Sequence, residues 1–270
     1  MKLAFIGGGN MASALIGGLI AKGAKPGALC VVEPVPGARR RLASKFKVHA
    51  SALPDARTLA ADTVVLAVKP QDMRAAAGTL AGKLGGKLVI SVAAGIRLRD
   101  LSRWLGGHAK LIRCMPNTPA LIGAGIAGLY APPGASAAEK RRAERILGAV
   151  GKVVWVKDES LLDPVTAVSA SGPAYVFWFI EQLAAAGTAL GLEPEASARL
   201  ALETVLGSAK LAAAAKEPPS VLRERVTSRG GTTAAALKVF EDEGLAERFK
   251  RAVEAASRRG AEMGDLLGKD

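Results

Sequence analysis

Short apolar runs alternate with helical stretches over the first 160 residues of the chain. The runs are almost continuous in apolar residues, which is typical of strands in a parallel sheet that helices cover on both faces. We expect strands at residues 2–6, 29–33, 63–68, 88–92, 111–114, 125–130 and 152–155. Helical patterns fall between them, at residues 11–22, 36–46, 72–84, 98–105 and 137–150. This alternation predicts an α/β fold in which residues 1–160 form a doubly wound domain.

The pattern changes near Asp163, where strand-like runs stop. From residue 161 to residue 270 we expect four or five helices, separated by glycine and proline breaks. The longest, over residues 194–216, is rich in alanine and apolar around most of its surface. A helix of this kind needs cover on nearly every side. The rest of the helical domain could supply that cover, and a partner subunit is the alternative.

The formal charge of +13 raises the question of nucleic-acid binding. Lysine and arginine are spread along the whole chain, and only 4% of the residues are aromatic, so no stacking platform for bases is indicated. We interpret the charges as solvated helix faces and expect no nucleic-acid partner. The two histidines, His49 and His108, are too few and too isolated in the sequence to suggest a metal site.

Two cysteines, Cys30 and Cys114, lie in apolar strand-like runs, which predicts buried free thiols rather than a disulfide framework. Residues 3–21 carry no charge and could be mistaken for a signal peptide or a membrane span. Glycines interrupt this stretch twice, and a buried strand, a tight turn and a buried helix explain it better. We therefore expect no targeting segment, no membrane partner and a cytoplasmic protein.

Residues 6–12, IGGGNMA, match the pattern G-x-G-x-x-A between an expected strand and an expected helix. The first glycine permits a tight turn, and the second lets a pyrophosphate approach the backbone. The small third residue allows the helix to pack closely on the strand. The dinucleotide-binding residues expected here are Ile6, Gly7, Gly8, Gly9, Asn10 and Met11.

The residues after the second expected strand bear on the choice of cofactor. Glu33 ends that strand, and an acid there normally accepts a hydrogen bond from the ribose 2′-hydroxyl of NAD. Three arginines at residues 39–41 could instead neutralise the 2′-phosphate of NADP, or lie on the solvent face of a helix. Glu33 favours NAD and the arginines favour NADP, so the residues alone do not decide between the two cofactors.

Three further loops follow expected strands and should meet at the carboxyl edge of the sheet, where ligands of such folds bind. Small residues in one of them would let a nicotinamide ring lie close, and Lys69 and Asn117 could donate hydrogen bonds to ribose or carboxamide. Turn formation and strand termination would also explain these loops. The candidate residues are Val68, Lys69, Pro70, Gln71, Ala93, Ala94 and Asn117.

Residues 226–233, VTSRGGTT, precede a helical run over residues 234–243. Their glycines and small hydroxyl residues would leave backbone N–H groups free at a helix N-terminus, which suits a small anion such as a carboxylate. An ordinary glycine turn followed by a capped helix is the alternative. A dinucleotide site together with a distant anion site predicts a dehydrogenase that acts on a small acid.

Six segments together resemble the pyrroline-5-carboxylate reductases, enzymes of the last step of proline biosynthesis. The segments are FIGGGNM at 5–11, LAVKPQ at 66–71, SVAAGI at 91–96, RCMPNTP at 113–119, LLDPVTAVSASGPAYVF at 161–177 and VTSRGGTTAAALKVFE at 226–241. They follow the order and spacing of that family along nearly the whole chain. The SGPAY and GGTT segments separate it from other Rossmann dehydrogenases.

The resemblance implies a Rossmann NAD(P)-binding domain over residues 1–160 and a helical dimerisation and substrate-binding domain over residues 161–270. It implies hydride transfer from NADPH, or from NADH, to L-1-pyrroline-5-carboxylate. Similar enzymes form homodimers that often assemble into decameric rings of five dimers. The catalytic residues it implies are Thr233, whose hydroxyl would lie near the ring nitrogen, and Ser228. The substrate-binding residues it implies are Gly230, Gly231, Thr232, Thr233 and Glu159.

The chain departs from the family at Arg229, where a proline would usually fix φ. An arginine there could strengthen carboxylate binding, and we expect it to point to solvent. Other readings are a reductase of another cyclic imine, a β-hydroxyacid dehydrogenase, and a non-enzymatic NADP-binding regulator. Hydroxyacid dehydrogenases generally need a catalytic lysine after the first domain, and residues 170–175 contain none.

Overall fold

The computed structural model describes residues 1–269, which form two compact units. The first unit comprises Met1–Ser171 and includes the end of the chain from Ala255 onward. The second comprises Gly172–Glu254. The C-terminal helix α12 (Leu245–Leu267) therefore begins in the second unit and ends in the first.

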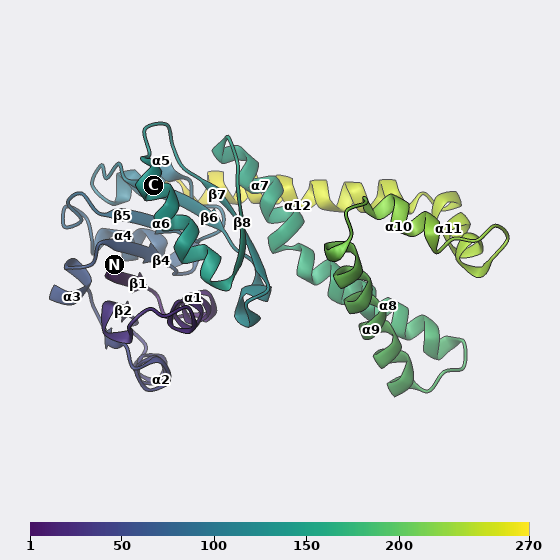
Figure 1. The fold of residues 1–270 in the computed structure, drawn as a ribbon. Coiled ribbons are helices and arrows are strands. Elements are labelled where there is room, and N and C mark those ends of the chain that lie inside the picture. Colours follow the sequence, from purple (N-terminus) through teal and green to yellow (C-terminus); the bar gives the residue numbers. More distant parts are fainter. Residues whose placement is uncertain (270) are drawn as a thin grey trace. The chain divides into compact units, whose positions relative to one another are not determined.

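An eight-stranded sheet forms the centre of the first unit (Figure 1), in the order β3-β2-β1-β4-β5-β6-β7-β8. The strands from β1 to β6 are parallel, and all the expected ones are present. At the other edge, β7 pairs antiparallel with β6 and parallel with β8. The strands are β1 (Leu3–Ile6), β2 (Leu29–Val32), β3 (His49–Ser51), β4 (Thr63–Leu66), β5 (Leu88–Ser91), β6 (Leu111–Met115), β7 (Gly125–Tyr130) and β8 (Gly151–Trp155).

The strand β7 runs antiparallel to β6, a direction that the residue pattern did not predict. Only a short 3₁₀ turn, η3 (Thr118–Ile122), connects β6 to β7. A parallel neighbour needs a crossover of a dozen or more residues, whereas a short connection reverses the chain. Apolar content does not distinguish the two directions, so the residue pattern predicted the strand without its orientation.

Helices cover both faces of the sheet, and a hydrophobic cluster fills each interface. On one face, Leu15 of α1 (Asn10–Ala21) and Ile146 of α6 (Ala137–Leu147) are fully buried. On the other, Met73 of α4 (Met73–Gly78) and Leu101 of α5 (Leu98–Trp104) are fully buried. The first cluster also takes Leu42 of α2 (Pro36–Phe46). The doubly wound α/β domain is confirmed.

Some short elements and helix ends differ from the prediction. The strand β3 and the helix α3 (Ala56–Leu59) were not expected, because three or four residues carry too little periodicity to detect. The helix predicted over residues 72–84 ends early, at Gly78. Gly82 lies beyond it with φ +71°, a left-handed conformation that ends helical structure.

A buried arginine, Arg113 on β6, joins several segments of the first unit. Its Nη1 lies 3.2 Å from Oε1 of Glu159 in the turn η5 (Glu159–Leu161), and its Nη2 lies 3.7 Å from Oδ1 of Asp163. Burial raises the pKa of the Asp163 carboxyl, an effect that the charges of Arg113 and Arg97 oppose. Arg97 also pairs with Asp265 of α12 at 2.8 Å. The Arg97–Asp265 pair thus ties the end of α12 to the sheet domain, while Arg113 joins β6 to the segment at residues 159–163.

Replacing Arg113 with leucine should lower the free energy of unfolding by about 3–5 kcal/mol, because two partly buried carboxylates would lose their counterion. Urea denaturation measures this loss. The matched control is Arg141→Leu, since Arg141 is exposed on α6 and should change the stability by less than about 0.5 kcal/mol. Equal losses in both variants would contradict a role for the buried ion pairs.

The second unit is helical, as predicted. Its helices α8 and α9 form a hairpin in which the Ser197 hydroxyl donates to the Ala184 carbonyl at 2.6 Å. That hydroxyl also fills the space where a side chain at Gly187 would lie. The helices are α8 (Gly172–Ala189), α9 (Pro194–Ala214), α10 (Pro219–Arg225), α11 (Thr232–Asp242) and the first part of α12.

Much of the apolar surface of this second unit is exposed in the single chain. On α9 only Ser197 and Ala201 are buried, whereas Leu200 and Leu211 are 56% and 60% exposed. On α8, Trp178 is 59% exposed. The chain therefore does not supply the cover that the sequence demands for the helix at residues 194–216. An exposed apolar surface of this extent is typical of a site of protein–protein contact.

Within residues 1–269, no helix combines the length and apolar character that a membrane span requires. In the same part of the chain, no group of histidine, cysteine and acidic side chains could hold a metal ion. Cys30 and Cys114 are buried free thiols, as predicted. Burial raises the pKa of the Cys30 thiol to about 11, so this sulfur is not a reactive thiolate at neutral pH.

Candidate active site

The three glycines between β1 and α1 serve different purposes. Gly7 has φ +94°, and a Cβ there would lie 2.7 Å from the carbonyl oxygen of Ala67. A Cβ at Gly8 would meet the side chains of Leu42 and Glu33. Gly9, by contrast, is exposed, and an added Cβ would find no atom within 4 Å. The fold needs the first two glycines, and the third leaves open space for a ligand.

The helix α1 begins beside this open space. Gly9 is its N-cap residue, and no side chain among the described residues caps the first turn. The first backbone N–H groups of a helix have no partner within the helix, and its dipole favours negative charge at that end. The loop and helix therefore fit the pyrophosphate of a dinucleotide.

Glu33, at the end of β2, is buried and turned toward the glycine loop. Its Oε2 accepts a hydrogen bond from the Gly8 N–H at 3.0 Å, and its Oε1 accepts one from the Val35 N–H at 2.9 Å. Arg39 donates to the carbonyls of Glu33 and Pro34, at 2.8 Å and 3.0 Å. Glu33 thus ties the glycine loop to the β2–α2 turn, and Arg39 places a cation beside the same turn.

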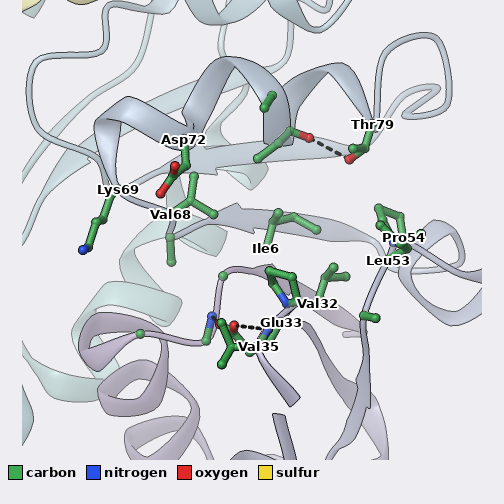
Figure 2. Close-up of a pocket in the computed structure, with 18 residues that line it drawn as sticks. Ile6, Val32, Glu33, Val35, Leu53, Pro54, Val68, Lys69, Asp72 and Thr79 are labelled. Carbon is green, nitrogen blue, oxygen red and sulfur yellow. Dashed lines mark hydrogen bonds between the residues drawn. The ribbon is translucent and has the colours of Figure 1, made fainter. Parts of the chain in front are cut away.

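A cavity of about 530 Å³ lies at the carboxyl ends of β1 to β4 (Figure 2). Lys69 stands at one end of it and Leu53 with Pro54 at the other, while Asp72 and Thr79 border it from the side of α4. The lining residues are Ile6, Gly7, Gly8, Gly9, Val32, Glu33, Pro34, Val35, Ala52, Leu53, Pro54, Ala67, Val68, Lys69, Asp72, Ala75, Ala76 and Thr79.

Part of the predicted cofactor set lines this cavity. The members that do are Ile6, Gly7, Gly8, Gly9, Glu33, Val68 and Lys69. Those outside the lining are Asn10, Met11, Pro70, Gln71, Ala93, Ala94 and Asn117. Asn117 uses its amide internally, because Nδ2 donates to the Ser169 carbonyl at 3.1 Å and Oδ1 accepts from the Ile126 N–H at 2.9 Å. Its contact with a cofactor stays a prediction.

Sequence reasoning missed the cavity wall formed by Ala52, Leu53 and Pro54. These residues follow β3, a strand too short to show a pattern. It also missed Ala75, Ala76 and Thr79 beside the predicted Asp72–Met73 helix start. The helical spacing of residues 72, 75, 76 and 79 places them on one face of the helix. The sequence pattern could therefore have predicted this part of the lining.

In the second unit, a tight turn leads into α11. The Gly231 N–H donates to the Ser228 carbonyl at 3.0 Å, and Gly230 has φ +74°. The Ser228 hydroxyl fills the place where a Cβ of Gly231 would lie. The helix α11 begins at Thr232, and no side chain among the described residues caps it. Thr233 is half-buried in its first turn, and Arg229 is exposed.

Glu159 is engaged within the first unit. Its Oε1 accepts hydrogen bonds from the Leu98 N–H at 2.8 Å and from Arg113 at 3.2 Å. Residues 228–233 belong to the second unit. The contacts of Glu159 give it a structural role, and its contact with substrate stays a prediction.

Residues 159–263 match the family model described as pyrroline-5-carboxylate reductase dimerisation, and residues 2–95 match that of NADP oxidoreductase, coenzyme F420-dependent. The pyrroline-5-carboxylate reductase of Pseudomonas aeruginosa is 44% identical to this chain, over 99% of the chain and 98% of its own length. The chain belongs to the pyrroline-5-carboxylate reductase family. The resemblance drawn from the six motifs is therefore confirmed, and the matched dimerisation segment supports a homo-oligomer.

Solved structures of this reductase family share the fold. The pyrroline-5-carboxylate reductase of Coxiella burnetii is 40% identical and superposes with a TM-score of 0.92, covering 97% of this chain and 98% of that one. The pyrroline carboxylate reductase of Plasmodium falciparum, solved with NADP bound, is 30% identical with a TM-score of 0.85, covering 98% of each chain. The Rossmann domain followed by a helical dimerisation domain is thus confirmed as the architecture.

Proposed function

We propose that this protein reduces L-1-pyrroline-5-carboxylate to L-proline in the cytoplasm, with NADPH as the preferred hydride donor and NADH as a second one. The observation that carries the proposal is the open glycine loop at the uncapped N-terminus of α1, facing a cavity of about 530 Å³, in a member of this family. The buried free thiols agree with a reducing compartment.

The residues present fit a dinucleotide. Gly9 leaves room for its pyrophosphate, and the α1 N–H groups would bind the negative charge. A bound reduced nicotinamide supplies the hydride for the reaction. Lys69 and the predicted Ala93 and Ala94 would border its ribose and ring. None of these side chains has to form a covalent bond, so their work is to hold the cofactor in place.

The substrate is a cyclic imine with a carboxylate, and the second unit offers matching groups. Uncapped N–H groups at the start of α11 would bind the carboxylate. The Thr233 hydroxyl would orient the imine nitrogen and help to protonate it. Hydride addition to the iminium carbon would give the secondary amine of proline, with the proton kept on the nitrogen. Little acid–base machinery is needed, in agreement with a chain that has two histidines.

The side chains at the β2–α2 turn support a preference for NADPH. Both Glu33 oxygens already accept backbone hydrogen bonds, which partly offsets the negative charge of Glu33. Arg39 is the arginine of the 39–41 run whose guanidinium reaches that turn, where a 2′-phosphate would lie. The exposed Arg40 and Arg41 stay on the solvent side of α2.

Replacing Arg39 with alanine should raise the KM for NADPH about five- to tenfold and leave the KM for NADH unchanged, since only NADPH carries the 2′-phosphate. Initial rates with each cofactor at saturating substrate measure the effect. Arg40→Ala is the matched control and should change neither value. A parallel rise with both cofactors would show that Arg39 supports the loop rather than the phosphate.

We further propose a homodimer formed through the exposed apolar faces of α8 and α9, with a decamer of five dimers as the larger assembly. Replacing Leu200 with glutamate should convert the oligomer to monomers and lower activity, because a charge would be buried at the interface. Light scattering over a range of protein concentrations measures this change. Lys157→Glu, at an exposed position of the first unit, is the control. A wild-type mass equal to one chain at every concentration would refute the dimer.

The activity itself is tested by mixing the purified protein with NADPH or NADH, with and without pyrroline-5-carboxylate. Oxidation of cofactor that depends on this substrate, with proline as the product, is expected. Consumption of neither cofactor would contradict the proposal and favour a regulator or a reductase of another imine.

A further inference from the structure

A short loop between β3 and α3, residues 51–55, is fixed at its base by a hydrogen bond between His49 and Asp55. Nε2 of His49, on β3, lies 2.6 Å from Oδ2 of Asp55, the N-cap residue of α3. The other oxygen of Asp55 accepts hydrogen bonds from the backbone N–H and the hydroxyl of Thr58, at 2.9 Å and 3.0 Å. Inside the loop, the Ser51 hydroxyl donates to the Leu53 carbonyl at 2.8 Å.

The other side of this loop forms one end of the cofactor cavity. Leu53 and Pro54 lie at this end (Figure 2), and the cavity lining also includes Ala52 and, from α4, Ala75 and Ala76. Leu53 is 68% exposed, so little packing beneath it keeps it in position. The position of Leu53 in the cavity wall therefore depends on the hydrogen bonds that fix the loop.

This end of the cavity is apolar and lies away from Lys69 (Figure 2). A flat aromatic ring such as adenine would fit between Leu53, Pro54 and the small side chains of α4. If the pyrophosphate binds at Gly9, the adenosine half of the dinucleotide extends past the β2–α2 turn, toward this end.

The negative charge of the Asp55 carboxylate strengthens the hydrogen bonds that it accepts. Burial would raise the pKa of Asp55, but the hydrogen bonds from Thr58 and His49 outweigh it and lower that pKa to about 2. The carboxylate is thus ionised at any working pH and accepts hydrogen bonds from both the strand side and the helix side of the loop. Such charge-assisted bonds are about twice as strong as neutral ones.

Building on the function proposed above, we propose that the His49–Asp55 pair holds loop 51–55 as the wall of the adenine site, which makes His49 a positioning residue for the cofactor. Without the pair, the loop would have to be ordered when the cofactor binds, and that entropic cost would weaken binding. The hydride-transfer step would be unaffected, because His49 acts only through Leu53 and Pro54.

The test is His49→Ala in the full-length protein. We expect the KM for NADPH and the dissociation constant of 2′,5′-ADP to rise about tenfold, with kcat at saturating NADPH unchanged. Turnover with reduced nicotinamide mononucleotide, which lacks adenine, should not change. His49→Gln keeps an N–H donor and should recover part of the affinity. His108→Ala is the matched control, since His108 also makes one hydrogen bond, to the Lys87 carbonyl at 2.9 Å, outside the cavity lining.

A second variant, Leu53→Ser, alters the wall directly at an exposed position where folding is not at risk. It should weaken 2′,5′-ADP binding as His49→Ala does. Unchanged 2′,5′-ADP affinity in His49→Ala would overturn the inference, and so would an equal loss with the adenine-free cofactor. The binding of 2′,5′-ADP is measured by calorimetry, which needs neither the imine substrate nor turnover. This inference can therefore fail or hold independently of whether the protein reduces pyrroline-5-carboxylate.

Discussion

Replacing Gly9 with alanine is expected to leave the protein fully folded and to raise the KM for NADPH by at least about tenfold. Gly9 has φ −69° and ψ −169°, a conformation that any residue adopts. An added Cβ meets no atom within 4 Å, so the fold has no reason to change. The methyl group would instead occupy the space through which a pyrophosphate approaches the backbone. Thermal unfolding and initial rates at varied NADPH measure the two effects.

Two other glycines serve as controls for this prediction. Gly27→Ala also adds a methyl group in open space, outside the cofactor cavity, and should change neither stability nor KM. Gly7→Ala should destabilise the fold itself, because φ is +94° and the Ala67 carbonyl lies 2.7 Å from the new atom. An unchanged KM in Gly9→Ala would mean that the cofactor does not bind over this loop.

Replacing Thr233 with alanine is expected to lower kcat by about 10²–10³-fold while the KM for NADPH stays unchanged. In the function proposed above, the Thr233 hydroxyl contacts the imine nitrogen and the cofactor contacts other residues. The backbone of α11 should be preserved, because alanine is the best helix former and Thr233 is not the N-cap residue. Steady-state kinetics with both substrates varied separates the two constants.

The matched variant Thr233→Ser keeps the hydroxyl and should retain most of the activity. Thr227→Ala removes a nearby hydroxyl that bonds to the Arg223 carbonyl at 2.6 Å, and it should have a small effect. Near-normal turnover in Thr233→Ala would remove this residue from the proposed chemistry. A loss of kcat in Thr233→Ser equal to that in Thr233→Ala would indicate that packing at this position, not the hydroxyl, sustains turnover.

The sequence predicted the sheet domain well wherever the pattern was local. The continuous apolar runs gave seven of the strands, and the glycine pattern at residues 7–12 gave the loop at the cavity. The strand β3 was missed because three residues show no period, and with it the wall at residues 52–54. The direction of β7 depends on the length of the connection before it, which hydrophobicity does not encode.

Side-chain roles were harder to predict, because they depend on partners far away in the chain. The sequence placed Glu33 at the end of β2 but did not show that its oxygens accept hydrogen bonds from the Gly8 and Val35 N–H groups; its contact with a ribose stays a prediction. The sequence also did not show that the Asn117 amide bonds to the Ser169 carbonyl and the Ile126 N–H, and its contact with a cofactor stays a prediction. For the helix at residues 194–216, the sequence predicted a need for cover, and side chains such as Leu200 and Leu211 of α9 are exposed in the single chain; the dimer proposed above would cover them.

The most direct test of the central claim is to follow the hydride itself. The protein would be supplied with pyrroline-5-carboxylate and NADPH deuterated at C4, the two stereoisomers being used in separate reactions. Mass spectrometry of the product should find proline with one deuterium on the former imine carbon, from one of the two stereoisomers. Proline without deuterium from both, or no proline at all, would contradict the assignment of this protein as a pyrroline-5-carboxylate reductase.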